Sequence, residues 1–216
     1  GRAIIADPRN DENLIIAGLH AAFLLFHNRA VDVVRGDRPS WPSDEVFAEA
    51  RRLTTWHYQW LLVHEFLPRI VGPRLMDEFL TQGPRFYQPA QGEGFIPIEF
   101  QIAYRFGHSM VRPSYRANFT GNQAQPFFGM IFEEPVQSSD PDDLRGGLRS
   151  ARRFIGWQTF FRFPGHEADL RSNKRIDTKL STPLFDLPLG AIASGTPPTS
   201  LAQRNLLRHL TWRVPS

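Results

Sequence analysis

Apolar residues recur every three or four positions along most of the chain, the spacing that places side chains on one face of a helix. The longest stripe runs from Ile15 to Ala30, behind Asp7 as a capping residue and Pro8 at the first helical position. Ser43 caps a second stripe in the same way. The helices predicted from these patterns cover residues 7–36, 43–72, 73–80, 98–113, 149–163 and 201–212.

Segments rich in glycine and proline separate these helices. Residues 83–97 and 180–200 are predicted loops, and residues 118–135 are predicted to be irregular, with short strands near residues 127–132. No internal repeat and no linker divides the sequence. We therefore predict a mainly α-helical fold with few or no strands, formed by residues 1–216 as one domain.

Composition indicates a soluble globular domain, with 41% hydrophobic and 22% charged residues in a chain of 216. The net charge of +3 is carried almost entirely by arginine, because only Lys174 and Lys179 are lysines. Basic residues are not interleaved with aromatic ones, which argues against nucleic-acid binding. The absence of cysteine excludes disulfides and thiolate-bound metals. No apolar stretch reaches the roughly 18–20 residues of a membrane span, so no transmembrane segment is predicted.

The stretch at residues 98–113 is the candidate for chemistry. As a helix it places Phe100, Tyr104 and His108 on one face. Gly107 costs roughly 1 kcal/mol relative to alanine inside a helix, which makes sense if a flat, bulky group approaches the backbone there. Haem fits that description, with the His108 imidazole as axial ligand of the iron. A lone histidine on a helical face is more often structural, and on the residues alone this alternative stays open.

Four segments of the sequence are informative together. They are Asp7–Asn13 with Leu19-His20 and Phe26–Arg29, Ala50–Arg52 through Leu67–Gly72, Ala103–Ser109 (A-Y-R-F-G-H-S), and Leu201–Pro215. In this order and at these separations they resemble the animal-type haem peroxidases of the peroxidase–cyclooxygenase superfamily. Each motif is short, but the set of four is specific. The resemblance implies a haem b cofactor and the central part of the helical haem-peroxidase fold.

The resemblance implies a role for each matching residue. His108 would be the proximal iron ligand, and Asn205 would accept a hydrogen bond from the other ring nitrogen of His108. Arg9 would be the distal cation that polarises bound peroxide. Arg105 and Arg208 would pair with the haem propionates. Read without the resemblance, Asn205 is a helix cap and Arg105 a solvated charge.

Some positions match less simply. Glu12 occupies the place from which mammalian members form an ester to the haem, although Arg9 and Glu12 also suit an i,i+3 pair on a helix surface. Asn13 stands where myeloperoxidase has a methionine, so the sulfonium bond of that enzyme cannot form here. Only eight residues precede Arg9 and none is histidine, so the family's distal histidine lies outside this sequence.

The sequence therefore resembles the middle of a peroxidase domain. The distal-histidine segment and the helices that follow the proximal asparagine are missing from it. Calcium would bind in the complete domain, through ligands outside this chain. Because the general base belongs to the missing segment, we expect the chain alone to be inactive or feeble.

The expected function is a haem peroxidase that uses hydrogen peroxide to oxidise a halide, a phenol or another small reductant. A fatty-acid dioxygenase of the same superfamily would carry its tyrosine three residues before the proximal histidine, whereas Tyr104 lies four before His108. A non-enzymatic helical scaffold without haem is the other alternative. Secretion is compatible with the sequence, but residues 1–5 are no signal peptide, and the compartment is left open.

Overall fold

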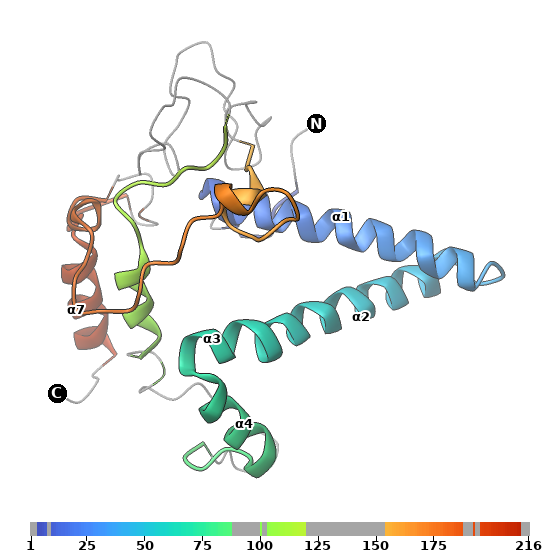
Figure 1. Cartoon of the computed structure of the whole chain (residues 1–216), viewed down its shortest axis with the longest axis horizontal. Coiled ribbons are helices and arrows are strands. Elements are labelled where there is room, and N and C mark those ends of the chain that lie inside the picture. Colours follow the sequence, from blue (N-terminus) through green and yellow to red (C-terminus); the bar gives the residue numbers. More distant parts are fainter. Residues whose placement is uncertain are drawn as a thin grey trace. The chain divides into compact units, whose positions relative to one another are not determined.

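A computed structural model describes residues 4–7, 10–87, 100, 103–119, 154–187, 192 and 195–212. The described chain is mainly α-helical, as predicted, and it contains no strand beyond an isolated bridge (Figure 1). It divides into two compact units. One, the split unit, consists of residues 1–19 and 98–216, and the other, the helical unit, consists of residues 20–97.

Helix α1 (Leu14–Asp37) begins later than predicted. The side-chain oxygen of Asn13 accepts hydrogen bonds from the backbone N–H groups of Ile15 (2.9 Å) and Ile16 (3.1 Å), so Asn13 supplies the cap. The carbonyl oxygen of Asp7 instead accepts from the N–H three residues on, at 2.9 Å, in a separate turn. The predicted start at Asp7 is therefore wrong. Residues 11–13 are turn and bend, and α1 begins at the fully buried Leu14, directly after its cap Asn13.

The predicted helix over residues 43–72 is present as α2 (Ser43–Leu61), a π-helical turn η2 (Leu62–Phe66) and α3 (Leu67–Val71). At the turn, the N–H of Leu67 bonds the carbonyl of Leu62, five residues back. Pro68 supplies the reason, because proline has no N–H and the ordinary ladder cannot continue through it. The residue before the helix is Pro42, so the predicted cap at Ser43 is one position off and makes no side-chain bond.

Gly72 and the ring contacts organise the rest of the helical unit. Gly72 has φ 93°, a left-handed conformation that favours glycine, and α4 (Pro73–Gln82) follows as predicted. Helix α2 runs back along α1 (Figure 1), with the Phe23 and Tyr58 rings 5.1 Å apart, edge to face. The buried apolar side chains described in this unit are Val34, Val46, Ala50 and Met76.

The sequence predicted an α-helix over residues 98–113, and of the described residues Phe100 and Ala103 are α-helical, whereas Tyr104–Met110 form a 3₁₀-helix, η3. The N–H of Val111 bonds the carbonyl of His108, three residues back, and Val111 itself is extended. Pro113 keeps the helix from resuming after Val111, because Arg112, the residue that precedes the proline, avoids the α conformation. In a 3₁₀-helix residues three apart lie on the same side. Arg105 and His108 therefore share one side of η3.

The described part of the predicted helix at 149–163 also folds differently. Residues 154–163 contain only the 3₁₀ turn η5 (Trp157–Thr159). Their backbone bonds to distant segments instead, since the N–H of Gly156 donates to the Ala117 carbonyl at 2.7 Å. The N–H of Arg171 likewise donates to the Thr159 carbonyl at 3.1 Å. The strands predicted near residues 127–132 lie outside the described residues.

The core of the split unit forms where the start of α1 meets these irregular segments. Leu14 and Ala117 are buried against each other, with Ile155 packed beside them. Gly18 permits this close approach. A Cβ added at Gly18 would lie 2.9 Å from Cγ1 of Ile155 and 3.3 Å from Cζ2 of Trp157, closer than side chains normally approach.

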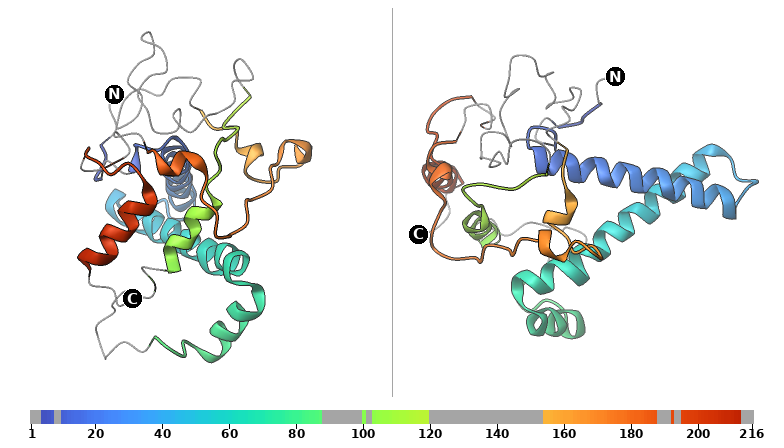
Figure 2. Two further views of the ribbon diagram at one scale, coloured as in Figure 1. Left: turned by 90° about the vertical axis from the view of Figure 1, so that its left-hand side faces the viewer. Right: turned by 45° about the horizontal axis from the view of Figure 1, so that its top comes forward.

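The C-terminal part contains two 3₁₀ turns, η6 (Glu167–Asp169) and η7 (Thr182–Phe185), and the helix α7 (Leu201–Thr211). Helix α7 confirms the prediction over residues 201–212. The hydroxyl of Ser200 caps it by accepting from the N–H of Gln203 at 3.5 Å. Figures 1 and 2 both show α7 beside η3.

One helix passes a test of length and composition for a membrane span. Helix α1 has 24 residues and a mean hydropathy of 1.5 over an 18-residue window, so its length and composition would allow it to cross a membrane. Polar residues such as His20 and His27 interrupt its apolar run. The core helix of a soluble domain and a signal sequence have the same profile, so this property assigns no location.

Candidate functional site

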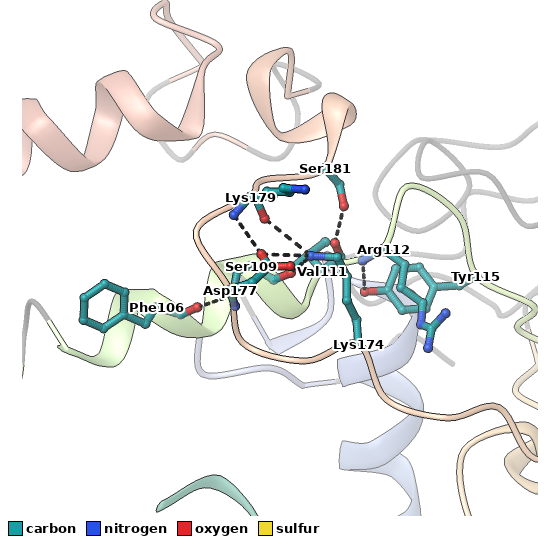
Figure 3. A network of polar contacts seen from close by, with 9 residues as sticks. All are labelled: Phe106, Ser109, Val111, Arg112, Tyr115, Lys174, Asp177, Lys179 and Ser181. Carbon is teal, nitrogen blue, oxygen red and sulfur yellow. Dashed lines mark hydrogen bonds and ion pairs between the residues drawn. The ribbon is translucent and has the colours of Figure 1, made fainter.

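Polar contacts around Ser109 hold η3 against a segment more than sixty residues further along the chain (Figure 3). The Ser109 side chain is only 3% exposed, and its hydroxyl accepts the N–H of Asp177 at 3.0 Å. The Ser109 carbonyl accepts from the ammonium group of Lys174, and the Ser181 hydroxyl donates to the Val111 carbonyl. A buried serine thus fixes the 3₁₀-helix that carries His108.

On this helix, His108 and Arg105 meet Asn205 of α7, although 97 residues separate His108 from Asn205. The amide nitrogen Nδ2 of Asn205 lies 3.2 Å from Nδ1 of His108. The guanidinium Nη1 of Arg105 donates to the amide oxygen Oδ1 of Asn205 at 3.4 Å. The amide therefore bridges the imidazole and the guanidinium.

The direction of the first hydrogen bond differs from the one that the family resemblance implies. An amide nitrogen can only donate, so in this arrangement Asn205 donates to Nδ1 and the proton of a neutral His108 ring sits on Nε2. The physical reason is the second contact. The N–H donor of Arg105 takes the amide oxygen, which turns the amide nitrogen toward His108.

The charges around His108 favour its neutral form. Burial lowers the pKa of His108 below its ordinary value, and the positive charge of Arg105 lowers the pKa further. Burial also lowers the pKa of Arg105, with the charge of Arg208 as the second cause. Arg208 stands three residues after Asn205 on α7. Two guanidinium groups near a neutral imidazole make a site that favours a negatively charged group.

The residues present fit a haem on this side. The Nε atom of Arg105 is buried and has no hydrogen-bond partner among the described residues, so it is available to a carboxylate. A Cβ at Gly107 would meet no atom within 4 Å, which leaves space at the backbone beside His108. One imidazole is the protein ligand that a haem iron needs on its proximal side. In the described part of the chain, no three His, Cys, Asp or Glu side chains group to hold a bare metal ion.

Two further residues were predicted for the site, Arg9 and Glu12. Arg9 lies outside the described residues. Glu12 lies half-buried in the turn before α1, in the same unit as His108. The functional roles of both stay predictions.

Sequence reasoning missed the residues that hold η3 in place. Lys174 carried a signal, because it is one of two lysines in a chain with 25 lysines and arginines. Ser109 also carried one, since it occupies the serine or threonine position of the histidine motif. Asp177 contributes its backbone N–H, which any residue except proline supplies, so no sequence pattern could single it out.

Comparison with known families decides the assignment. The family model of the animal haem peroxidases matches residues 3–151. The chain belongs to this family. Arg105 and His108 lie inside the matched range, whereas Asn205 and Arg208 lie beyond it. The contact between Asn205 and His108 therefore joins the matched range to a segment that the family model does not cover.

Several of the similar proteins are named as peroxidases. They include myeloperoxidase of Mus musculus (27% identical over 124 residues), thyroid peroxidase of Homo sapiens (26% over 145) and chorion peroxidase of Aedes aegypti (26% over 146). These alignments cover 57%, 67% and 64% of this chain, in that order, but only 17%, 15% and 18% of the relatives. The chain thus spans less than a fifth of their length. Family membership supports a peroxidase function in general, with haem as the cofactor of the family.

Proposed function

We propose that this chain forms the proximal side of a haem peroxidase site, within one partial domain over residues 1–216. The complete protein would reduce hydrogen peroxide and oxidise a halide, a phenol or another small reductant. The observation that carries the proposal is the meeting of His108, Asn205 and Arg105 at a site that fits haem. When bound, haem supplies the oxidation–reduction chemistry, and the residues of this chain hold and tune it.

His108 is the proposed iron ligand. A ring nitrogen binds iron only when it carries no proton, so the lowered pKa of His108 keeps the ligand available at neutral pH. If His108 held the iron through Nε2, its ring proton would sit on Nδ1, which would then be a donor. The donor needs an acceptor to fix the plane of the ring and to raise the electron density on Nε2.

Asn205 provides that acceptor after a half-turn of its amide. In the described arrangement Arg105 holds the amide oxygen and thereby keeps it away from His108. If Arg105 paired with a propionate, it would release the amide oxygen, and Asn205 could accept from Nδ1–H of His108. The 3.4 Å contact is long for a hydrogen bond, so this exchange is inexpensive. Arg105 thus couples occupation of the site to the orientation of its ligand.

The other predicted residues complete the proposal. Arg208 is the second cation for the propionates, because its charge already acts on Arg105. Arg9 is proposed as the distal cation that polarises peroxide, and Glu12 as a contact to the haem edge; both rest on the family motif. A general base for the peroxide proton belongs to the distal side.

A haemin titration of the purified chain tests the proposal, with His108→Ala alongside. We expect a saturable, near-stoichiometric Soret band that His108→Ala abolishes. His166→Ala is the matched control, because His166 is an exposed histidine of the same unit that contacts Asp169 at 3.2 Å. That variant should bind like the wild type.

Two outcomes would sink the proposal. A band that His108→Ala leaves unchanged would place haemin elsewhere, and no specific band at all would favour a scaffold without haem. Circular dichroism of each variant separates loss of the ligand from loss of the fold.

The coupling through Arg105 has its own test. Long-range nitrogen–proton NMR correlations of His108 report which ring nitrogen carries the proton. Without haemin we expect the proton on Nε2, and Arg105→Gln should shift the population toward Nδ1 because the amide oxygen is then free. If the tautomer of His108 is unchanged in Arg105→Gln, Arg105 does not control the orientation of the Asn205 amide. The conclusion from the haemin titration would still stand.

A further inference from the structure

A pocket in the split unit belongs to no assigned site. Its volume is about 380 Å³, within the range of pockets that hold small molecules. Its lining residues come from the segment after η3, from η5 and its surroundings, and from residues 171–174. It therefore stands at the junction of the three irregular segments of this unit.

Four side chains of its lining are cations and none is an acid. The cations are Arg112, Arg116, Arg171 and Lys174. Lys174 is engaged, because its ammonium binds the Ser109 carbonyl and lies 3.6 Å from the carboxylate of Asp177. Arg112 donates to the Ser172 carbonyl. Figure 3 shows Arg112, Lys174 and the ring of Tyr115 near one another.

The other two cations keep their charge free for a ligand. Arg116 has its guanidinium carbon 4.2 Å from the centre of the Phe119 ring. Neither Arg116 nor Arg171 makes a side-chain hydrogen bond or ion pair within the described residues. Such an excess of positive charge in a concave site attracts and concentrates anions. Guanidinium groups bind oxygen anions through two parallel N–H bonds, so carboxylate and phosphate are the matching groups.

The other lining residues indicate the chemistry of the rest of the ligand. Tyr115 and Phe160 are aromatic, and Met110 adds a polarisable thioether. The hydroxyl of Tyr115 is held by the backbone N–H of Arg112 at 2.9 Å, which fixes the ring. The pocket is too large for a lone inorganic anion, so a flat ring bearing the anionic group fills it better.

We propose that this pocket binds a small aromatic anion, with a carboxylate or phosphate on Arg116 and Arg171 and the ring against Tyr115 and Phe160. The proposal does not depend on haem binding by His108. Because the pocket starts at Met110, two residues after His108, its occupant would also brace the segment that follows η3.

Calorimetric titration of the full chain with benzoate, phenyl phosphate and benzamide tests the proposal. We expect saturable binding of benzoate or phenyl phosphate with a dissociation constant of about 1 mM or below, and the tighter of the two identifies the preferred group. Benzamide has the same ring without the charge and should bind at least about tenfold more weakly. Added salt should weaken the binding of both anions to the pocket.

The double variant Arg116→Gln/Arg171→Gln should lower the affinity for the anion at least about tenfold. Arg162→Gln is the matched control, an exposed arginine of the same unit outside the pocket, and should leave the affinity unchanged. Equal binding of benzoate and benzamide, or an unaffected double variant, would overturn the proposal. If the double variant does not fold, the wild-type titrations still test the proposal. The absence of saturable binding of either anion to the wild type would also overturn it.

Discussion

The helical unit and the split unit are built from contacts of different range. Among the described residues of the helical unit, side-chain hydrogen bonds such as those from Arg52 to Glu49 and from the Thr54 hydroxyl to the Ala50 carbonyl (2.8 Å) join residues three or four apart. In the split unit Asn205 reaches His108 across 97 residues. The first kind of contact forms as soon as a helix forms, whereas the second requires the tertiary fold.

The difference explains where the candidate chemistry lies. A regular helix needs its backbone groups for its own ladder, so its side chains are placed by periodicity alone. The short 3₁₀-helix η3 is instead held by buried Ser109 and by Lys174 from another segment. Such external support fixes the rotation of η3, and with it the direction of His108, more firmly than a local sequence could.

Removing the long-range contacts of Asn205 with His108 and Arg105 should have the largest effect. Asn205→Leu removes the hydrogen-bond partner of His108 Nδ1, and loss of such a partner typically lowers affinity for a ligated metal about 10- to 100-fold. We expect a haemin affinity reduced by that factor, measured by the Soret titration.

Gln203→Leu is the control for this substitution. Gln203 is exposed on the same helix, α7, and its replacement tests whether an added leucine alone disturbs the helix. Equal loss of haemin affinity in both variants would show that the amide of Asn205 has no special part.

Two hydroxyl groups allow the same comparison for stability. Ser109→Ala removes the buried hydroxyl that accepts the N–H of Asp177 in a partly buried hydrogen bond, which costs about 1 kcal/mol. Thr54→Val removes a hydroxyl bonded within its own helix and should change stability by no more than about 0.5 kcal/mol.

Hydrogen exchange measured by mass spectrometry localises these two effects. Ser109→Ala should accelerate exchange in peptides around residues 104–119 and 174–187 and leave peptides of α2 unchanged. Uniformly faster exchange over both units would contradict the distinction between local and long-range contacts.

The same distinction decides how much the sequence predicted. Residues 43–82 have unbroken apolar stripes and clear stops at Gly72 and Gly83, so their helices follow from local rules. At residues 98–113 the same stripe was right only in part: Phe100 and Ala103 are α-helical, whereas Tyr104–Met110 form a 3₁₀-helix held by the polar contacts of Ser109. Periodicity cannot register contacts from segments that lie sixty or more residues away.

The site residues were predicted from the family motif, and the spacing of apolar residues could not have identified them. The motif singled out His108, Arg105 and Asn205, which the fold then brings within hydrogen-bond distance of one another. It did not give the direction of the amide, because that depends on the competition between His108 and Arg105 for one oxygen. It gave no hint of the cationic pocket, whose Arg116 and Arg171 are 55 positions apart and meet only after folding.

Helix α1 runs through both units and supplies a matched pair of glycines. At Gly18 an added Cβ would press on Ile155 and Trp157, and overpacking of this kind costs about 1–3 kcal/mol, more than the gain of up to about 1 kcal/mol in helix propensity. At Gly36 nothing lies within 4 Å, so only the gain remains.

Urea unfolding of the two alanine variants measures the contrast. We expect Gly18→Ala to destabilise the chain by about 1 kcal/mol and Gly36→Ala to stabilise it by up to about 1 kcal/mol. Stabilisation by both substitutions would mean that α1 is not packed tightly against Ile155.

The smallest effect is expected for the ion pair of Glu49 and Arg52 on α2, which tests how little an exposed local contact contributes. The hydrogen bond from Arg52 holds the pKa of Glu49 below its ordinary value, so folding favours the charged carboxylate. Its contribution is present above the unfolded pKa of about 4.3 and is lost as the pH falls through the folded pKa. The melting temperature of the wild type should therefore be slightly higher than that of Glu49→Gln at pH 7. At acidic pH the two melting temperatures should be equal. A difference that persists in acid would instead arise from packing of the side chain, for example through Arg52, whose guanidinium carbon lies 4.0 Å from the centre of the Trp56 ring.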